Sequence, residues 1–359
     1  MSGKKYKTLS DVAVKLRGDL NEHHFILLYA YNGTGKTRLS MEFKDIGKRR
    51  SPVPDTLYYN AYTEDLFHWN NDLENDTERH LIINKDSKFF AGFKELALET
   101  KIFNFLERYA NFDFKIDYDN WTITFNKGEQ NNIKVSRGEE NIFIWCIFLA
   151  ITELAIDDDG TGTYNWVKFI YIDDPISSLD DNNVIGVASD LAKLLKKGKN
   201  KIKVVISSHH SLFYNVMYNE LKQIKPNASH FLHKNVGDGY TLKSTSDTPF
   251  FHHVALLTEL KNVADTDMVN TYHFNMLRSI LEKTSTFFGY DNFSICIKGV
   301  EDEVLFSRAL NLLSHGNYSI YQPIEMNKDN KELFSRILSA FLEKYEFKLP
   351  EIFAHNNNA

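Results

Sequence analysis

One stretch near the start of the chain restricts its possible folds more than any other. Residues 25–31, FILLYAY, are an apolar run that suits a buried strand, and a glycine-bearing loop and a helical pattern follow it. The loop ends in GTGKT and follows the pattern G-x-x-x-x-G-K-[ST], with Ala30 in the place of its first glycine. Glycines let backbone amides turn toward a phosphate, and the start of a helix attracts anions. The stretch therefore predicts the strand, loop and helix of a P-loop nucleotide-binding domain.

The pattern gives the side chains of this loop defined roles. Lys36 supplies positive charge to the β- and γ-phosphates of a nucleotide, and the hydroxyl of Thr37 is a ligand for Mg²⁺. We expect the nucleotide to contact one continuous segment, made of Asn32, Gly33, Thr34, Gly35, Lys36, Thr37 and Arg38. A chance glycine turn before a helix is the alternative, and an intact GKT after a strand disfavours it.

A second apolar run supplies the acidic residues that a P-loop enzyme needs. Residues 167–172, VKFIYI, suit a central parallel strand, and Asp173 and Asp174 follow it directly. Parallel strands bring their carboxyl ends to one edge of the sheet, where ligands bind. We expect Asp173 to hold Mg²⁺ through water and Asp174 to orient or deprotonate the attacking water, because phosphoryl transfer depends mainly on positioning.

Three further stretches resemble motifs of ABC-type ATPases. VSRGEE, residues 135–140, is similar to their signature loop, with Ser136 and Gly138 at the key positions. SSLD ends in Asp180 and resembles the D-loop, and His209 follows another apolar run at the place of the switch histidine. The resemblance implies a homodimer or higher homo-oligomer, because the signature loop of such ATPases completes the site of the opposite subunit.

Composition and charge narrow the class of protein. The formal net charge of −6 means that a nucleic-acid partner would need a local basic patch. The 2 cysteines, Cys146 and Cys296, lack metal-ligand spacing, and a single pair so far apart gives no disulfide framework, which favours a reducing cytoplasm. Residues 141–156 form the most apolar run, but it is too short and too interrupted to cross a bilayer comfortably. We therefore expect a buried core helix there, a cytoplasmic protein and no membrane partner.

The character of the chain changes after about Ser244. Upstream, strand patterns alternate with helical patterns, which is typical of a mostly parallel sheet flanked by helices. Downstream, apolar residues recur at helical spacing, as in residues 330–347. We predict an α/β P-loop NTPase domain of ABC type over residues 1–245 and a mainly α-helical domain over residues 246–359.

Four polar residues of the helical part form a candidate catalytic set. Arg278 and Glu282 are one helical turn apart, and Arg308 and His315 bound an Arg-x6-His element that two helical turns would bring to one face. His can act as a general acid or base, Glu can be the partner base or can orient the His, and Arg can bind the scissile phosphate through two nitrogens. Such a set suffices for metal-independent RNA cleavage through the 2′-hydroxyl. On residue types alone, an intrahelical ion pair and a structural histidine remain the commoner interpretation.

Over nearly its full length the sequence resembles the PrrC-type anticodon nucleases. The matching stretches include YAYNGTGKTRLS, SRGEENIFIW and FIYIDDPISSLDDN in the first part, and YHFNMLRSILEKTSTFFGY and SRALNLLSH in the second. LYYNAYTEDLFHWNNDL makes the resemblance specific, because generic ABC-type ATPases do not share it. The resemblance implies an NTPase joined to a ribonuclease whose triad falls on Arg278, Glu282 and His315. The Arg-x6-His element resembles that of HEPN ribonucleases, which adds Arg308.

Further expectations rest on this resemblance alone. Members of the family cut a tRNA anticodon loop, typically of tRNA-Lys on the 5′ side of the wobble nucleotide, and Asp247 best matches the residue that contacts the wobble base. They hydrolyse ATP or GTP and bind dTTP as a cellular signal. They act in phage defence, held silent beside a type I restriction–modification enzyme. No obvious glutamine marks the Q-loop, and Glu64 is the candidate in its place.

Two other functions remain open at this point. The same ATPase motifs fit a sensor whose helical part docks a separate effector, in which case the triad residues are structural. A DNA-end-processing ATPase is a further alternative. The segment between Lys36 and Ser136 weakens it, because that segment is short and lacks the sustained heptads of a long coiled coil.

Overall fold

The computed structural model describes most of the chain and divides it into two compact units. The described residues are 4–50, 53–60, 66–70, 79–90, 93–94, 96, 98–176, 181–235, 239–245, 257, 260–261, 263–297 and 326–345. The first unit is Gly3–Ser246, and the second is Asp247–Ala359 together with Met1–Ser2. Each unit buries its own set of apolar side chains.

A seven-stranded sheet forms the centre of the first unit. In sheet order its strands are β1 (Lys4–Tyr6), β11 (Tyr240–Ser244), β10 (Asn227–Lys234), β2 (Phe25–Tyr29), β9 (Lys203–Ser208), β8 (Phe169–Asp173) and β3 (Thr56–Asn60). The strands from β10 to β3 run parallel, and β11 lies antiparallel between β1 and β10. The register pairs Tyr29 with Ser208 and Asp173 with Ser207. The carboxyl ends of β2, β9 and β8 therefore meet at one edge of the sheet.

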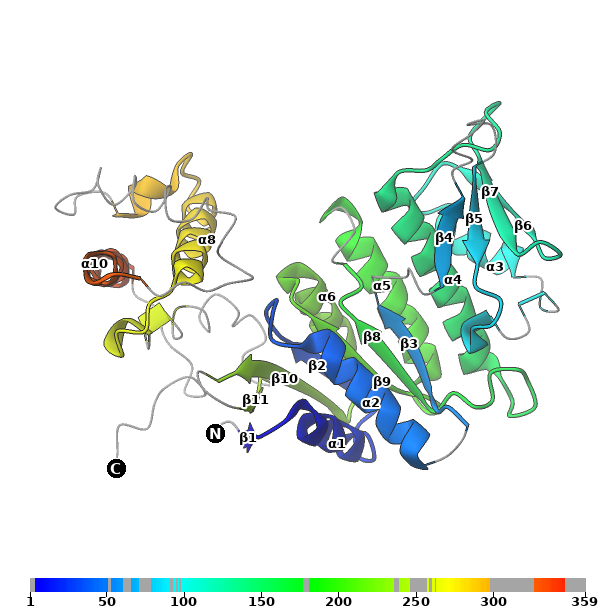
Figure 1. Ribbon diagram of the computed structural model, residues 1–359, viewed down its shortest axis with the longest axis horizontal. Helices are drawn as coiled ribbons and strands as arrows, with labels where there is room; N and C mark the ends of the chain where they lie inside the picture. The colour runs from blue at the N-terminus through cyan, green and yellow to red at the C-terminus, as the bar shows by residue number, and fades with distance from the viewer. Residues whose placement is uncertain are drawn as a thin grey trace. The chain divides into compact units, whose positions relative to one another are not determined.

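Helices cover both faces of this sheet (Figure 1). They are α1 (Leu9–Asp19), α2 (Lys36–Arg50), α5 (Asp181–Gly198) and α6 (Ser211–Leu221). α1 and α2 pack together on one face, where Leu16, Leu39 and Phe43 join a core cluster with strand residues. α5 and α6 pack together on the other face. Because both faces are covered, β2 is apolar along its whole length, and β8 and β9 carry apolar runs that end in polar residues. The arrangement confirms the predicted α/β fold of a P-loop NTPase, with a mostly parallel sheet flanked by helices.

A smaller antiparallel sheet extends the first unit. Its strands, in order, are β4 (Phe67–Asn70), β5 (His80–Ile83), β7 (Thr122–Asn126) and β6 (Asp113–Asp117). The same region holds η1 (Lys88–Phe90), α3 (Glu99–Leu106) and the long helix α4 (Arg137–Asp157). Residues 141–152 of α4 are all buried, which confirms the predicted core helix. Among the described residues, no helix is both long enough and apolar enough to cross a membrane.

The second unit, as far as it is described, is helical. Its elements are α8 (Thr271–Phe287), η2 (Phe293–Ile297) and α10 (Lys328–Lys344). α10 overlaps residues 330–347, the segment whose apolar spacing predicted a helix, and begins two residues before it. The rings of Phe274 on α8 and Phe334 on α10 are 5.1 Å apart, and both side chains are fully buried. This aromatic contact joins the two long helices, while η2 packs on both of them.

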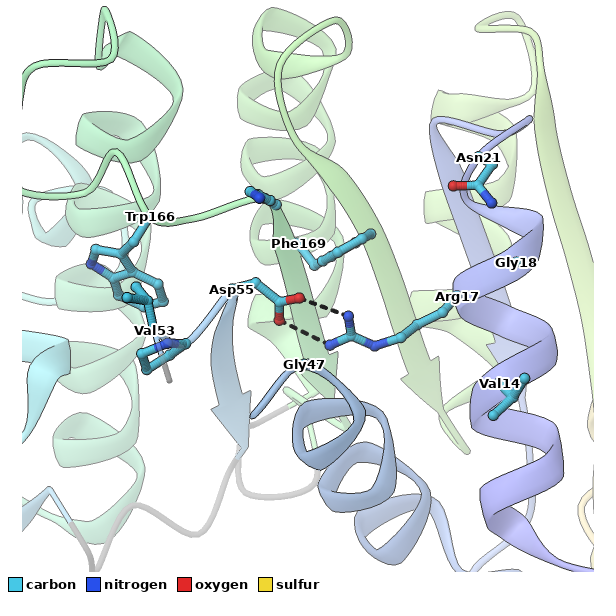
Figure 2. Close-up of a pocket in the computed structure, with 11 residues that line it drawn as sticks. Val14, Arg17, Gly18, Asn21, Gly47, Val53, Asp55, Trp166 and Phe169 are labelled. Atoms are coloured by element: carbon cyan, nitrogen blue, oxygen red, sulfur yellow. Dashed lines mark hydrogen bonds and ion pairs between the residues drawn. The ribbon is translucent and has the colours of Figure 1, made fainter. Parts of the chain in front are cut away.

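A cavity of about 530 Å³ lies at the opposite edge of the large sheet, where β3 and β8 begin. Figure 2 shows the side chain of Arg17 pointing from α1 toward Asp55 at one side of it. The guanidinium donates to both carboxylate oxygens at 2.8 and 2.9 Å and to the carbonyl of Phe43 at 2.8 Å. It also lies over the rings of Phe43 and Phe169. Arg17 therefore joins α1, α2 and the start of β3 through one buried charge.

We expect Arg17→Ala to lower the free energy of unfolding of the first unit by about 3–5 kcal/mol, because it leaves the Asp55 carboxylate without its partner in a largely buried place. All 4 tryptophans of the chain lie between positions 69 and 166, so tryptophan fluorescence during urea denaturation reports on this unit. Arg49→Ala on α2 is the matched control, since Arg49 is exposed and its ion pair with Glu42 is loose. A loss at Arg17 no larger than at Arg49 would refute the structural role of this pair.

Candidate functional site

The P-loop lies between β2 and α2, as the sequence predicted. Gly33 and Gly35 have φ angles of +80° and +101°, in the region that side-chain-bearing residues rarely adopt. A Cβ at Gly35 would also lie 3.0 Å from the Cδ1 of Leu9. Ala30, in the position of the missing first glycine, is fully buried at the end of the strand. The two glycines that the loop geometry requires are therefore the two that the sequence retains.

Lys36 begins helix α2, and its side chain turns back over the loop. Its ammonium donates to the carbonyls of Ala30 and Tyr31 at 3.2 and 3.3 Å and to the side-chain oxygen of Asn32 at 3.3 Å. It also lies 3.3 Å from a carboxylate oxygen of Asp174. Only 7% of Lys36 is exposed. The loop thus holds one buried positive charge at the place where the pattern expects phosphates.

Thr37 and Asp173, the two residues predicted to hold Mg²⁺, are in direct contact. The Thr37 hydroxyl donates to one Asp173 oxygen at 2.7 Å, and the Ser207 hydroxyl donates to the other at 2.8 Å. Burial raises the pKa of Asp173 above its usual value, although both hydrogen bonds oppose the rise. The sequence reasoning missed Ser207, whose only signal was its place at the end of an apolar run.

The donor set at this point fits Mg²⁺. Magnesium prefers hard oxygen ligands and is commonly bound by one or two carboxylates, waters and substrate phosphates. A hydroxyl and a buried carboxylate beside the phosphate loop meet that preference, and a cation there would favour the ionised form of Asp173. In the described part of the chain, no group of three or more His, Cys, Asp or Glu side chains is arranged to hold a metal ion.

Three groups of two residues, Ser208 and His209, hold the Asp174 carboxylate at the ends of β8 and β9. The Nδ1 atom of His209 lies 2.5 Å from one carboxylate oxygen, while the Ser208 hydroxyl and the His209 backbone amide donate to the other at 3.1 and 3.2 Å. Burial alone would raise the pKa of Asp174, but the His209 contact and the charge of Lys36 lower it below its usual value. Its φ of +51° is unusual for a residue other than glycine. Asp174 is thus an ionised, fixed carboxylate beside Lys36.

The predicted signature loop forms the start of helix α4. Ser136 caps the helix in a capping box, in which its hydroxyl accepts from the Glu139 amide at 3.3 Å and Glu139 accepts from the Ser136 amide at 2.8 Å. Gly138 in the first turn is exposed, with open space where a Cβ would lie. Trp69 on β4 donates to the buried Glu140 carboxylate at 2.9 Å. The helix N-terminus is therefore open to solvent on one side and braced by the small sheet behind it.

Among the remaining predicted nucleotide-binding residues, Thr34 is buried and the side chains of Asn32 and Arg38 are exposed at the mouth of the loop. Asp180 and the Q-loop candidate Glu64 lie outside the described residues. The same holds for Asp247 of the predicted wobble-base contact and for the whole Arg-x6-His element, with Arg308 and His315.

The described part of the candidate nuclease set is the pair on α8. Arg278 Nε donates to a Glu282 carboxylate oxygen at 2.7 Å across one helical turn. The guanidinium also lies over the ring of Phe293 on η2, with 5.4 Å to its centroid. The Phe293 ring and the Glu282 carboxylate both fix the orientation of the Arg278 side chain. A fixed orientation is a condition for binding a phosphate through two nitrogens. The expected ion pair is thus present.

The helix that carries this pair has a buried histidine, His273, in its first turn. His273 Nδ1 accepts from the backbone amide of Asn270 at 2.9 Å, and burial lowers the pKa of His273 to about 4. When folding lowers the pKa of a histidine, its contribution to stability is fully present above the pKa of the unfolded state. That contribution is lost as the pH falls from the pKa of the unfolded state to the pKa of the folded state. The contribution of His273 should therefore disappear between pH 6.5 and pH 4.

We expect the helical unit to lose about 2 kcal/mol of stability through His273 between pH 7 and pH 5. Hydrogen exchange of α8 and α10 peptides, corrected for the intrinsic effect of pH, measures it. His273→Gln should flatten this pH dependence, while the exposed His68 on β4 replaced by Gln should leave it unchanged. Equal slopes for the wild type and His273→Gln would contradict the assignment.

Known proteins resemble the chain at two levels. A family model described as an AAA domain matches residues 95–346, well over half of the chain. A curated anticodon nuclease of Escherichia coli is 32% identical over an alignment of 349 positions, and the match covers 86% of this chain and 86% of that one.

Solved structures give weaker likenesses. The SMC head domain from Thermotoga maritima has a TM-score of 0.32 at 13% identity, covering 62% of this chain and 90% of that one. An SMC head bound to the C-terminal winged-helix domain of ScpA has a TM-score of 0.34 at 12% identity, covering 63% of this chain and 91% of that one. The fold assignment rests instead on the strand order and the P-loop geometry described above.

Proposed function

This chain belongs to the anticodon nuclease family, and from that premise we propose that it is an NTP-gated ribonuclease that cleaves a tRNA anticodon loop. The observation that carries the proposal is the extent of the family match, which at 86% of both chains spans the ATPase unit and the helical unit together. The family model described as an AAA domain matches residues 95–346, which include Asp173 and Asp174 of the ATPase unit and reach into the helical unit. The Arg278–Glu282 pair supplies a candidate centre in the other half.

In the ATPase unit, each described residue has a role that its contacts support. Lys36 and the amides of residues 32–38 would bind the phosphates of ATP or GTP. Thr37 and Asp173 would hold Mg²⁺, which would neutralise phosphate charge. Asp174, kept ionised by His209 and Lys36, would position the attacking water, and His209 would sense the γ-phosphate. Ser136, Gly138 and Asp180 would complete the site of a second copy, so we propose a homodimer or higher homo-oligomer.

In the helical unit, we assign cleavage to Arg278, Glu282, Arg308 and His315. The 2′-hydroxyl oxygen attacks the adjacent phosphorus and the bond from phosphorus to the 5′-oxygen breaks. One group of the Glu282–His315 pair accepts the 2′-hydroxyl proton and the other gives a proton to the leaving oxygen. Products are a 2′,3′-cyclic phosphate and a 5′-hydroxyl. The arginines stabilise the charge on the phosphate in the transition state.

The finer parts of the proposal follow the family resemblance. The substrate would be tRNA-Lys, cut on the 5′ side of the wobble nucleotide with Asp247 near the wobble base. dTTP would act as a bound regulator. The protein would act in the cytoplasm as a phage-defence effector, silenced by a type I restriction–modification enzyme until infection disturbs it.

Sequencing tRNA ends after induced expression tests the proposal directly. We expect new ends within one anticodon loop, with 2′,3′-cyclic phosphates, and their loss in His315→Ala. A purified chain that hydrolyses NTP but never cuts tRNA, with or without nucleotide, would instead support the sensor that docks a separate effector. Cleavage that persists unchanged in His315→Ala would refute the assignment of the nuclease centre.

A further inference from the structure

The surface of the helical unit carries an unusual group of exposed aromatic rings. Phe287 is 83% exposed, Phe288 is 50% exposed and Tyr290 is 41% exposed. Among the described residues, the only other exposed Phe, Tyr or Trp side chain is Phe103, which is 40% exposed. Three such rings within four positions are therefore a local feature, since the other exposed large apolar side chains among the described residues are far apart along the sequence.

The backbone holds these rings in a fixed arrangement. α8 ends in a Schellman motif, in which the Tyr290 amide donates to the Ser285 carbonyl at 2.8 Å and the Gly289 amide to the Thr286 carbonyl at 3.1 Å. Gly289 has the φ of +74° that this turn requires. The chain therefore reverses directly after Phe288, and Tyr290 returns beside it instead of continuing away from the helix.

The rings also stack on one another and on the core. Phe288 lies parallel to Tyr290, at 6.0 Å and 24°, and to Tyr345 after α10, at 5.4 Å and 29°. Phe287 meets Phe288 edge to face at 5.3 Å. Tyr345 contacts the fully buried Phe341, which anchors the series in the unit. Because their positions are set before any ligand arrives, binding a flat ligand would cost little ordering of side chains.

We propose that Phe287, Phe288 and Tyr290, the aromatic platform, stack unpaired nucleobases of an RNA loop. The proposal rests on the proposed nuclease function, because the platform ends the same helix that carries Arg278 and Glu282. Single-stranded RNA loops are commonly recognised by stacking of splayed bases on Phe and Tyr rings. Phe287 follows Glu282 by five residues, about 7–8 Å along the helix axis. Bases next to the scissile phosphate are thus within reach.

The charges around the platform favour bases over a duplex backbone. Lys283 and Lys344 are exposed near it, but so are Glu343 and Asp291, so this surface is not a positive groove for paired phosphates. The Lys344 ammonium is also engaged with the Ile295 carbonyl at 2.8 Å. Duplex binding draws mainly on phosphate contacts, whereas stacking needs only an exposed ring face. The ligand that matches is the unpaired part of a hairpin loop.

Binding of an anticodon stem-loop with 2-aminopurine at one unpaired position tests the platform, since stacking on a ring quenches that base. The full chain should quench the probe, and Phe287→Ala should weaken binding by about 5- to 100-fold, the effect of one lost stacking partner. Phe287→Trp should restore binding. Phe103→Ala on α3 is the matched control for an exposed ring, and it should bind as the wild type does. NTP hydrolysis should be unchanged in all three.

Two results would overturn the platform: a wild-type chain that does not quench the probe, or a Phe287→Ala variant that binds as tightly as the wild type. Loss of binding together with loss of oligomeric mass in light scattering would also overturn it, because the rings would then join copies of the chain. Failure of the nuclease proposal is distinct from these results. If RNA-loop binding depends on Phe287 but the chain cuts no tRNA, the platform is supported and the nuclease proposal is refuted. If the chain cuts tRNA equally well with and without the Phe287 ring, the nuclease proposal is supported and the platform is refuted.

Discussion

Replacing Lys36 with alanine is expected to lower NTP hydrolysis by about 100- to 1,000-fold, because it removes the charge that stabilises the phosphates as the reaction proceeds. Nucleotide binding should fall as well, because no other lysine or arginine in the described part of the chain could replace the charge of Lys36 at the loop. Among the described residues, Lys36 is the only lysine or arginine within ion-pair distance of Asp174. Binding of a fluorescent ATP or GTP analogue by anisotropy and release of phosphate measure the two effects. If nucleotide gates the nuclease, tRNA cleavage must disappear together with hydrolysis.

A suitable control lies on the same helix. Lys48 is exposed on α2 and makes only a loose ion pair with Asp45 at 3.5 Å, so Lys48→Ala should hydrolyse NTP at the wild-type rate. Circular dichroism should show that the Lys36 variant keeps its fold, because the contacts it loses lie within one loop. A Lys36→Ala chain that binds no nucleotide yet cuts tRNA at full rate would refute the gating proposal and leave the nuclease assignment standing.

Arg278→Lys is expected to separate stability from catalysis. The lysine keeps the positive charge beside Glu282, so the free energy of unfolding should change by less than about 1 kcal/mol. It lacks the planar guanidinium that binds two phosphate oxygens at once and stacks on Phe293. tRNA cleavage should therefore fall by about 100-fold or more, while NTP hydrolysis stays the same. Cleavage by single turnover at saturating tRNA measures the chemical effect apart from binding.

The comparison needs an arginine with no expected part in the reaction. Arg336 is exposed on α10 of the same unit, and Arg336→Lys should leave cleavage unchanged. Normal cleavage by Arg278→Lys would reduce the Arg278–Glu282 pair to an ordinary intrahelical ion pair. A variant that loses cleavage and also unfolds in less urea would show that the pair acts mainly on stability.

The geometry of the P-loop and of the sheet edge beside it could be predicted from the sequence because its parts are set by short-range rules. The glycines fix the loop, the loop fixes the start of α2, and a parallel strand must end at the same sheet edge. Thr37 and Asp173, which are 136 positions apart, could therefore be paired in advance. The family resemblance, and not the spacing, singled out Arg278 and Glu282 from the many ion pairs of this kind.

Other contacts had no sequence signal of their own. Trp69 and Glu140 are 71 positions apart and meet only because the small sheet packs against α4. Ser207 precedes the motif histidines and resembles any small polar residue at the end of a strand. The stacked rings around Phe288 depend on Tyr345, which a different helix brings to them. Such contacts arise from the tertiary packing of separate elements, and the residue pattern of a single helix or strand does not predict them.

The backbone at Asp174 limits which side chains that position can accept. A left-handed residue is tolerated best as glycine, asparagine or aspartate, whose short side chains avoid the steric cost. A glycine at position 174 would have no carboxylate, and an asparagine would have no negative charge. Aspartate alone combines this backbone conformation with a carboxylate on a side chain short enough to bond to Ser208 and His209. Replacing Asp174 with glutamate therefore keeps the carboxylate but puts a longer side chain on a backbone conformation that disfavours it. Sequence variation among working relatives with this backbone should be narrower at position 174 than its chemistry alone would require.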